Sequence, residues 1–338
     1  MKRFRVVVAG CGGMARTWVD YAIKRSDTEI VALVDLYPLT AQSLASQYGL
    51  SVPIYDDLRE AIVATKANLV FDITVPESHV TITTTALSLG CDVFGEKPMG
   101  ASMEQAQAMA EAARVAGRHY AVMQNRRYQP EIRAFRDLVQ GGVIGTPGAA
   151  YADFFLGPHF GGFREAMEHP LILDMAIHTF DQARFILGAN PVAVYCKAFN
   201  PAGSWYAGSS SAICLFDMSD GSVFCYRGSW SAQGVPTSWE ADWRVTGSQG
   251  TAVWDGANRL FAEVVDPASE PSFIRDVQRI EPSKTWEGQA GHHGCLDEMF
   301  ASLIENRPAE TDSADNLHSV AMVFAAIESA KREQKVYL

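Results

Sequence analysis

The first 120 residues alternate short apolar runs with segments in which apolar residues recur at helical spacing. The apolar runs read FRVVVAG, EIVALVD, LVFDITV, CDVFGEK and HYAVMQN. Runs that are apolar at almost every position are typical of strands buried on both faces, as in a parallel sheet covered by helices. The alternation therefore predicts an α/β domain with a doubly wound parallel sheet.

From about residue 150 the pattern changes to β runs joined by short turns such as SDG and SQG. These runs read AVYCKAF, SSAICLFDM, SVFCYRGSW, EADWRVTG and GTAVWDG. Links of hairpin length predict antiparallel neighbours. One helix, LILDMAIHTFDQARFILG, precedes them, and two more helical segments close the chain. We therefore predict a nucleotide-binding domain over residues 1–122 and an α+β domain over 123–338, with the boundary near 121–128.

Composition narrows the class of partner. The chain has 338 residues and a net charge of −11, and this negative field disfavours nucleic acid and anionic membranes. No apolar stretch approaches the roughly 20 residues of a membrane span. Six cysteines without a repeated spacing are typical of reduced thiols. We expect a soluble, cytoplasmic protein that acts on a small molecule.

A glycine motif follows the first apolar run. In GCGGMA, Gly10, Gly12 and Ala15 have the GxGxxA spacing of dinucleotide-binding turns, and the helix that begins there offers free N–H groups to phosphates. Asp35 ends the second run, where a carboxylate binds the adenosine ribose and repels a 2′-phosphate. The motif predicts NAD, with NADP less favoured, although Asp35 has the alternative of a turn or capping role. The predicted cofactor site also includes Gly13, Met14 and Leu36.

A lysine stands where another apolar run ends. In VFGEKPMG, Lys97 lies at the predicted carboxyl end of a parallel strand, which is where open α/β sheets bind ligands. The alternative is a surface lysine that pairs with Glu96.

The helix in the second half has a polar face. Asp174, His178 and Asp181 are spaced i, i+4 and i+7, opposite an apolar stripe. Either Asp174 and His178 form part of a site, or they are a solvated face with a weak pair. We interpret Asp181 as structural.

Taken with the glycine motif, three further segments give a specific pattern: TVPESH at 74–79, EKP at 96–98 and DMAIHTFD at 174–181. With these segments the chain resembles the Gfo/Idh/MocA family of oxidoreductases over nearly its whole length. The resemblance implies a Rossmann domain, a second domain with an open, mostly antiparallel sheet, and reversible oxidation of a sugar or polyol hydroxyl. One departure is EHPLILDM, where many members have a glycine-rich segment, and it leaves the shape of the substrate pocket open.

The resemblance also implies roles for individual residues. Lys97 is the acid/base candidate, and Asp174 and His178 assist it. Residues implied to contact the cofactor are Val75, Pro76, His79, Glu96 and Asn125.

The chemistry agrees with this assignment, because oxidising an alcohol requires a base that takes the hydroxyl proton. Burial and the positive charge of NAD⁺ both favour the neutral amine of a lysine in that position. We therefore predict an NAD(H)-dependent oxidoreductase acting on the CH–OH group of a sugar, polyol or inositol. Two alternatives are an NAD-requiring glycosidase with transient redox chemistry and a non-catalytic dinucleotide sensor.

The remaining polar residues give weaker indications. Arg127 either binds substrate or anchors the domain junction, and His159 and His169 are candidate substrate contacts. The adjacent histidines of GHHGC at 291–295 lack a second ligand pair at suitable spacing, so we predict no metal site. Tryptophans on the β runs suggest a packed sheet face, and family habit suggests that a homodimer or homotetramer associates through it.

Overall fold

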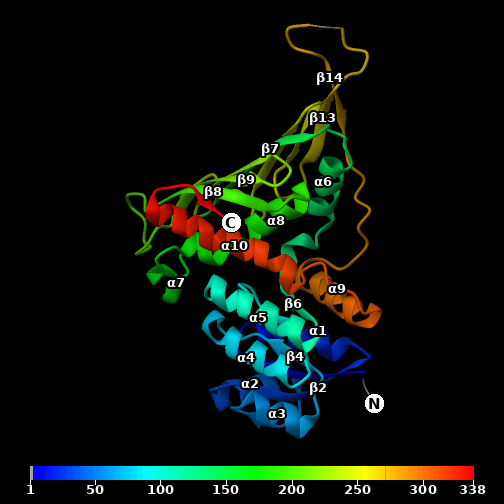
Figure 1. Cartoon of the computed structure of the whole chain (residues 1–338), viewed down its shortest axis with the longest axis vertical. Helices are drawn as coiled ribbons and strands as arrows, with labels where there is room; N and C mark the ends of the chain where they lie inside the picture. Colours follow the sequence, from blue (N-terminus) through cyan, green and yellow to red (C-terminus); the bar gives the residue numbers. More distant parts are fainter. Residues whose placement is uncertain (1–2, 271) are drawn as a thin grey trace. The chain divides into compact units, whose positions relative to one another are not determined.

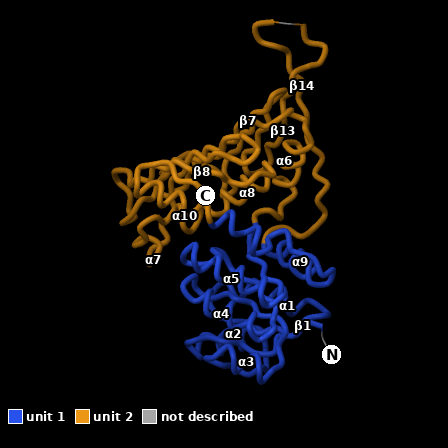
Figure 2. The backbone as a smooth tube through the Cα atoms, in the orientation of Figure 1, with its two compact units in different colours: residues 1–125, 292–320 blue, residues 126–291, 321–338 orange. Residues whose placement is uncertain are grey.

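A computed structural model describes residues 3–270 and 272–338. The chain forms two compact units, which Figure 2 shows in different colours. Unit 1 contains residues 1–125 and 292–320, and unit 2 contains residues 126–291 and 321–338. The division differs from the predicted one, since the chain returns to unit 1 after unit 2 has been built.

Unit 1 contains a parallel sheet with the strand order β3-β2-β1-β4-β5-β6. Its strands are β1 (Phe4–Ala9), β2 (Thr28–Val34), β3 (Ile54–Tyr55), β4 (Leu69–Asp72), β5 (Asp92–Gly95) and β6 (Tyr120–Val122). The helices between them are α1 (Ala15–Lys24), α2 (Pro38–Tyr48), α3 (Leu58–Thr65), α4 (Pro76–Ser88) and α5 (Met103–Ala116) (Figure 1). This is the predicted Rossmann arrangement, and it is confirmed.

Local chemistry sets the ends of these helices. The Asp57 side chain accepts a hydrogen bond from the Glu60 N–H at the start of α3, and Ser102 caps α5 in the same way. Gly117, with a φ of +61°, ends α5 in the left-handed conformation that glycine adopts without strain.

The return segment supplies part of the core of unit 1. It contains α9 (Gly291–Glu305) and the start of α10 (Ser313–Arg332). The ring of Phe300 lies 5.1 Å from that of Phe4 and 5.2 Å from that of Phe94, and all three side chains are buried. The Val122 N–H also donates to the Thr311 carbonyl at 2.9 Å. These contacts explain why residues 292–320 belong with the nucleotide-binding half of the sequence.

Unit 2 contains a sheet with the strand order β14-β13-β12-β11-β7-β10-β9-β8-β15. Its strands are β7 (Pro147–Phe155), β8 (Pro191–Phe199), β9 (Ser211–Met218), β10 (Val223–Ser229), β11 (Asp242–Gly247), β12 (Gly250–Trp254), β13 (Leu260–Val265), β14 (Val277–Ile280) and β15 (Val336–Tyr337). The β7–β10 pair is parallel, and the other pairs are antiparallel. The predicted α+β class, with a mostly antiparallel sheet, is confirmed.

Helices pack on one face of this sheet (Figure 1). They are α6 (Pro130–Gln140), α8 (Ile177–Leu187) and the later part of α10, while the short α7 (Phe163–Ala166) precedes a π-helical turn, η2 (Leu171–Ala176). A single-turn 3₁₀ helix, η1 (Asn125–Arg127), stands at the boundary between the units. Every residue of α8 is buried, and Phe180 packs edge-on against Phe216 and Tyr226. Among the described residues, no helix has the length and apolar character needed to cross a membrane.

Candidate functional site

The loop that joins β1 to α1 has open space beside two of its glycines. Gly10 has a φ of +85°, and a Cβ there would lie 2.5 Å from the Ile73 carbonyl oxygen, so only glycine fits. A Cβ on Gly12 or Gly13 would meet no atom within 4 Å. The main chain can thus approach a ligand closely, and the N-terminal N–H groups of α1 favour a phosphate. The loop fits the pyrophosphate of NAD.

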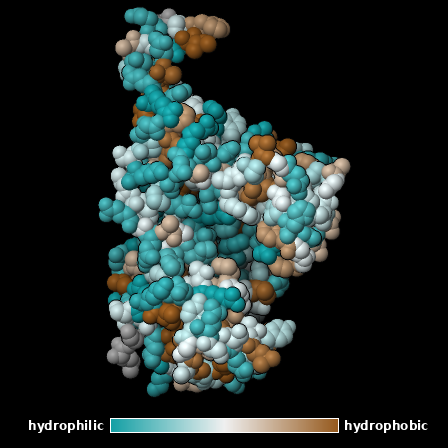
Figure 3. Space-filling model, turned by 180° about the vertical axis from the view of Figure 1, so that it is seen from behind, coloured by the Kyte–Doolittle hydropathy of each residue, from teal (hydrophilic) through white to brown (hydrophobic). Residues whose placement is uncertain are grey.

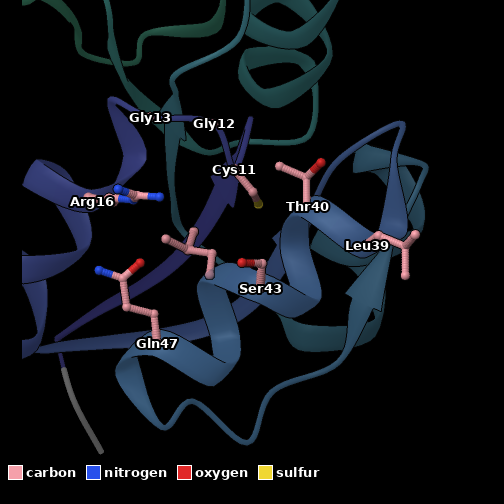
Figure 4. Close-up of a pocket in the computed structure, with 9 residues that line it drawn as sticks. Cys11, Gly12, Gly13, Arg16, Leu39, Thr40, Ser43 and Gln47 are labelled. Carbon is pink, nitrogen blue, oxygen red and sulfur yellow. The ribbon is translucent and has the colours of Figure 1, made fainter.

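A cavity of about 350 Å³ lies beside this loop (Figure 4). Arg16 from α1 and three polar residues of α2 line it: Thr40, Ser43 and Gln47. The sequence reasoning missed these residues. Their spacing of three and four positions, which places them on one face of a helix, is the signal that identifies them.

Asp35 holds the loop in place. Its Oδ2 accepts a hydrogen bond from the Cys11 N–H at 2.9 Å, and its Oδ1 accepts one from the Tyr37 N–H at 2.8 Å. Each carboxylate oxygen has a second lone pair, so the group remains able to accept from a ribose hydroxyl. Burial, reinforced by the charge of Asp35, raises the pKa of the Cys11 thiol to about 12. The Cys11 thiol therefore stays protonated, and it lines the cavity without acting as a nucleophile.

Three predicted cofactor residues have exposed apolar side chains: Met14, Leu36 and Val75. Met14 and Val75 are the residues immediately before α1 and α4, and Pro76 is the first residue of α4. Proline suits that position, because the first helical N–H has no partner within the helix. The side chains of Met14 and Val75 are therefore available to a ligand at the two helix N-termini.

A buried network fixes the turn between β4 and α4. The Asp72 carboxylate accepts hydrogen bonds from the Thr74 hydroxyl at 2.6 Å and from the Thr83 hydroxyl at 2.8 Å. It also lies 2.9 Å from Nδ1 of His79. The imidazole is buried, and within the described residues its Nε2 has no hydrogen-bond partner. His79 is thus held through one ring nitrogen, and the other is left for a ligand.

The end of β5 carries Glu96 and Lys97. Glu96 is buried, and its Oε1 accepts a hydrogen bond from the Trp18 indole at 2.8 Å. Its Oε2 accepts from the Lys97 backbone N–H at 3.2 Å. The Lys97 side chain is half-buried. The carboxylate of Glu96 therefore links α1 to the main chain at Lys97.

Asn125 meets the histidine pair of the return segment. Its Nδ2 lies 3.4 Å from Nδ1 of His292, at the start of α9. The neighbouring His293 packs against the ring of Tyr21, with centroids 5.5 Å apart. Among the residues that the structure describes, no group of three or more His, Cys, Asp or Glu side chains is arranged to hold a metal ion.

In unit 2, Asp174 lies in the π-helical turn and His178 in the first turn of α8. His178 is buried, so it does not lie on a solvated face, and its part in a site stays a prediction. Asp174 is partly exposed, and its Oδ2 lies 2.6 Å from Nε of Arg164. Five residues of the EHPLILDM segment, Leu171–Met175, thus form most of a π-helical turn, a geometry often found at functional sites. Sequence reasoning missed Arg164, because nothing in the spacing links it to Asp174.

Arg127 forms a buried ion pair. Its Nε and Nη2 each lie 2.6 Å from an oxygen of Asp181, and both side chains are almost wholly buried. Both residues belong to unit 2, so this pair anchors η1 to α8 within that unit, and the roles of substrate binding and of anchoring the domain junction both stay predictions for Arg127. The pair also agrees with the structural interpretation of Asp181.

The two histidines of the connection before η2 lie in different surroundings. His159 is exposed and stacks on Trp205, with ring centroids 3.8 Å apart, while the Gln233 amide lies 3.2 Å from its Nε2. His169 is buried, and burial lowers its pKa. His159 is therefore accessible to a ligand, and His169 is neutral near pH 7.

The sequence and fold agree with a known family. Residues 4–124 match the family model described as "Oxidoreductase family, NAD-binding Rossmann fold", and residues 132–253 match the "GFO/IDH/MocA C-terminal domain". The chain belongs to the Gfo/Idh/MocA family of oxidoreductases. It is accordingly an NAD-binding oxidoreductase, and the open loop at Gly12 and Gly13 fits that cofactor.

Three relatives illustrate the similarity in sequence and fold. The rhizopine catabolism protein MocA of Rhizobium meliloti is 30% identical, over 66% of this chain and 70% of the relative. Inositol 2-dehydrogenase of the same species is 27% identical over 98% of both chains. The crystal structure of an Agrobacterium radiobacter oxidoreductase in complex with NAD⁺, L-tartaric acid and magnesium superposes with a TM-score of 0.84. It is 23% identical and covers 99% of this chain and 98% of that one.

Proposed function

We propose that the protein catalyses the reversible, NAD(H)-dependent oxidation of a CH–OH group in a sugar, polyol or inositol. Lys97 accepts the hydroxyl proton, and His178 and Asp174 assist. The proposal is supported by the relatives above, one of which is named as a dehydrogenase of inositol.

One observation carries the proposal: a half-buried lysine at the carboxyl end of a parallel strand in an NAD-binding domain. Ligands of open α/β sheets bind at that edge. The main chain there is fixed through Glu96, whose carboxylate is itself held by Trp18. A fixed backbone limits the positions of the amine, and well-oriented groups lower the barrier of a proton transfer.

The cofactor and Lys97 have separate roles in the proposed reaction. When bound, NAD⁺ supplies the acceptor for the hydride that leaves the carbinol carbon. Lys97 in its neutral form takes the hydroxyl proton, which completes the two-electron oxidation to a carbonyl. In the reverse direction the ammonium returns that proton to the oxygen.

Unit 2 supplies the assisting pair. The imidazole of His178 can donate to or accept from a substrate hydroxyl, and burial limits competition from water. Asp174 precedes it by four residues, close to one helical turn, and contributes a negative charge.

The test is a panel of sugars, inositols and glycosides incubated with NAD⁺, monitored by NADH absorbance and by product analysis. The proposed dehydrogenase forms NADH and a carbonyl product in equal amounts with at least one free sugar or polyol. Cleavage of a glycoside without net NADH would establish the glycosidase alternative instead. Tight NAD⁺ binding with no turnover across the panel would favour the sensor.

We further propose that the enzyme is a homodimer or homotetramer that associates through the face of the sheet opposite the helices. Paired residues form an apolar row across four adjacent strands: Tyr195, Leu215, Cys225 and Tyr151. Tyr195, Leu215 and Tyr151 are 43%, 46% and 42% exposed. In Figure 3 a brown patch bordered by teal side chains lies over β8 and β9. An apolar centre with a polar rim is typical of subunit interfaces.

Sedimentation of the wild type and of Leu215→Asp tests this association. The variant places a charge in the apolar row, and we expect it to sediment as a smaller species. Val115→Asp alters an exposed apolar residue of α5 in unit 1 and serves as the matched control. A monomeric wild type would refute the proposal.

A further inference from the structure

The Asp174 carboxylate is engaged by a residue from another element. Arg164, on α7, places its Nε 2.6 Å from Oδ2 of Asp174, and the two side chains are 36% and 19% exposed. The pair joins the short helix α7 to the π-helical turn that carries Asp174. Charge-assisted hydrogen bonds of this length are among the stronger polar contacts in proteins.

Two aromatic rings restrict the position of the Arg164 guanidinium. The Arg164 Cζ lies 5.2 Å from the ring centroid of Phe160 and 4.8 Å from that of Phe163. Phe160 in turn packs on the buried Trp230, with centroids 5.2 Å apart. Cation–π contacts on two rings restrict the side chain, so less rotamer entropy is lost when it binds Asp174.

The backbone of α7 is also tied down. The Glu165 carboxylate accepts a hydrogen bond from the Gly161 N–H at 2.8 Å, and the Glu165 carbonyl accepts one from the Ala207 N–H at 2.8 Å. These contacts hold α7 to the strand connection that contains Ala207. Arg164 is therefore presented from a fixed element, although the segment before it contains consecutive glycines at positive φ, Gly161 and Gly162.

We propose that Arg164 is a positioning residue that fixes the Asp174 carboxylate for its work beside His178, without touching the reacting atoms. This inference rests on the proposed function, because it assumes that Asp174 assists turnover. The inference identifies Arg164 as the residue that orients Asp174. It also gives a reason for the two aromatic rings beside Arg164, which restrict its side chain. Loss of the guanidinium removes a charge-assisted contact that orients the Asp174 carboxylate, and misplacement of a catalytic group by about 1 Å can cost about 100-fold in rate.

A double-mutant cycle on kcat and kcat/KM tests the inference, with the substrate that the panel identifies. We expect Arg164→Gln to lower kcat about 10- to 100-fold, with little change in KM. In the Asp174→Asn background the same change should have no further effect, because the carboxylate that Arg164 positions is already gone. Arg164→Lys keeps a cation and should recover part of the loss.

The matched control is Arg136→Gln. Arg136 also pairs with an aspartate, Asp137, and lies over the ring of Phe185, but it belongs to α6. We expect wild-type kcat for this variant. Thermal unfolding of each variant identifies losses that come from stability alone, and Arg164→Lys provides the comparison if Arg164→Gln folds poorly.

Two results would overturn the positioning role while leaving the proposed function intact. One is a normal kcat in Arg164→Gln when Asp174→Asn is impaired. The other is an equal loss from Arg164→Gln with and without Asp174, which would show that Arg164 acts independently. If Asp174→Asn itself has full activity while Lys97→Ala is inactive, the assisting role of Asp174 fails and the inference fails with it.

Discussion

The indole Nε1 of Trp18 donates a hydrogen bond to Oε1 of Glu96 across 2.8 Å, joining α1 to the residue that follows β5. Trp18 is fully buried, and its ring meets that of Phe71 edge-on at 5.0 Å. Because the other oxygen of Glu96 accepts from the Lys97 N–H, the indole determines where the main chain of the proposed base lies.

Replacing Trp18 with Phe retains an aromatic ring but removes the donor. A buried carboxylate then lacks one partner, which costs about 1–3 kcal/mol. We expect a lower free energy of unfolding in urea and a reduced kcat, because Glu96 no longer holds Lys97 in one position.

Tyr21→Phe is the control, since it removes a hydroxyl bond to Asp297 in the same unit and leaves Glu96 untouched. It should affect stability more than kcat. Equal kcat values for Trp18→Phe and the wild type would show that Glu96 needs no partner from α1.

Changing Lys97 to Met removes the amine and keeps a side chain of similar length. If the amine transfers the proton, kcat falls about 10²- to 10⁴-fold. NAD⁺ affinity should change little, because the loop at Gly12 and the cavity beside α2 remain. Calorimetric titration with NAD⁺, combined with turnover measurements, checks both expectations. A variant that loses NAD⁺ binding along with turnover would place Lys97 in the cofactor site instead.

Asp35→Ala tests how the loop and the ribose site depend on one carboxylate. The change removes the acceptor of the Cys11 and Tyr37 N–H groups and the predicted partner of the ribose. Hydrogen bonds to a charged group contribute about 1.5–3 kcal/mol, so the Kd for NAD⁺ should rise at least tenfold. NADP⁺ should bind the variant better relative to NAD⁺, because the repelling charge has gone.

Titration of both dinucleotides into wild type, Asp35→Ala and Ser43→Ala measures these effects. Ser43 lines the same cavity but is uncharged. Ser43→Ala should therefore change the Kd for NAD⁺ less than Asp35→Ala does. An unaltered NAD⁺ affinity in Asp35→Ala would leave that residue with a purely local turn role.

The Arg127–Asp181 pair gives opposite expectations for single and double changes. Arg127→Ala removes the bidentate partner of the buried Asp181 carboxylate, while Arg184 Nη1 remains 3.8 Å from its Oδ1, so we expect the free energy of unfolding to fall by about 3 kcal/mol or less. Arg127→Met combined with Asp181→Leu replaces both charges with apolar groups and should recover part of that loss, because the buried Arg184 then loses its neighbouring carboxylate. Urea unfolding measures the stability, and KM of the double variant separates the two roles. A stable double variant with a strongly raised KM would support substrate binding by Arg127, and an unchanged KM would contradict it.

His169 should make the protein less stable in acid. Burial lowers its pKa in the folded state, so below about pH 6.5 the unfolded chain binds a proton that the folded protein does not. The free energy of unfolding therefore falls as the pH decreases through this range. His169→Gln removes the titrating group and should flatten the profile between pH 7 and 5. A profile identical to the wild type would mean that other groups dominate.

Much of the fold could be predicted because the strands of unit 1 are apolar at nearly every position. Val6, Val7 and Val8 are all fully buried, as covered strands require. The glycine loop was equally accessible to prediction, since the GxGxxA spacing and the positive φ that favours glycine at position 10 are local properties of the turn. Motif spacing also located Lys97 at the end of β5 and His178 on a helix.

One central strand escaped prediction. In β7 the buried positions Ala150 and Ala152 are small, and they alternate with Tyr151 and Asp153. Small side chains give a weak hydrophobic signal, and the strand is stabilised by parallel pairing with β10, a partner distant in sequence. Such pairing is a property of the assembled sheet rather than of the segment.

Contacts between distant segments also escaped prediction at the site. Arg164 and Asp174 are ten residues apart, and only the path of the chain through α7 and the π-helical turn brings them together. The pairing of Arg127 with Asp181 likewise could not be predicted, because the two residues are 54 positions apart in the sequence.

The return segment limits how the gene can be divided. A polypeptide that stops after β6 lacks Phe300, and the rings of Phe4 and Phe94 then lose the neighbour that separates them from solvent. Expression of an isolated nucleotide-binding module therefore requires residues 3–125 to be spliced to 292–320. Residues 126–291 are therefore, in their chain topology, a large insertion into an interrupted Rossmann domain.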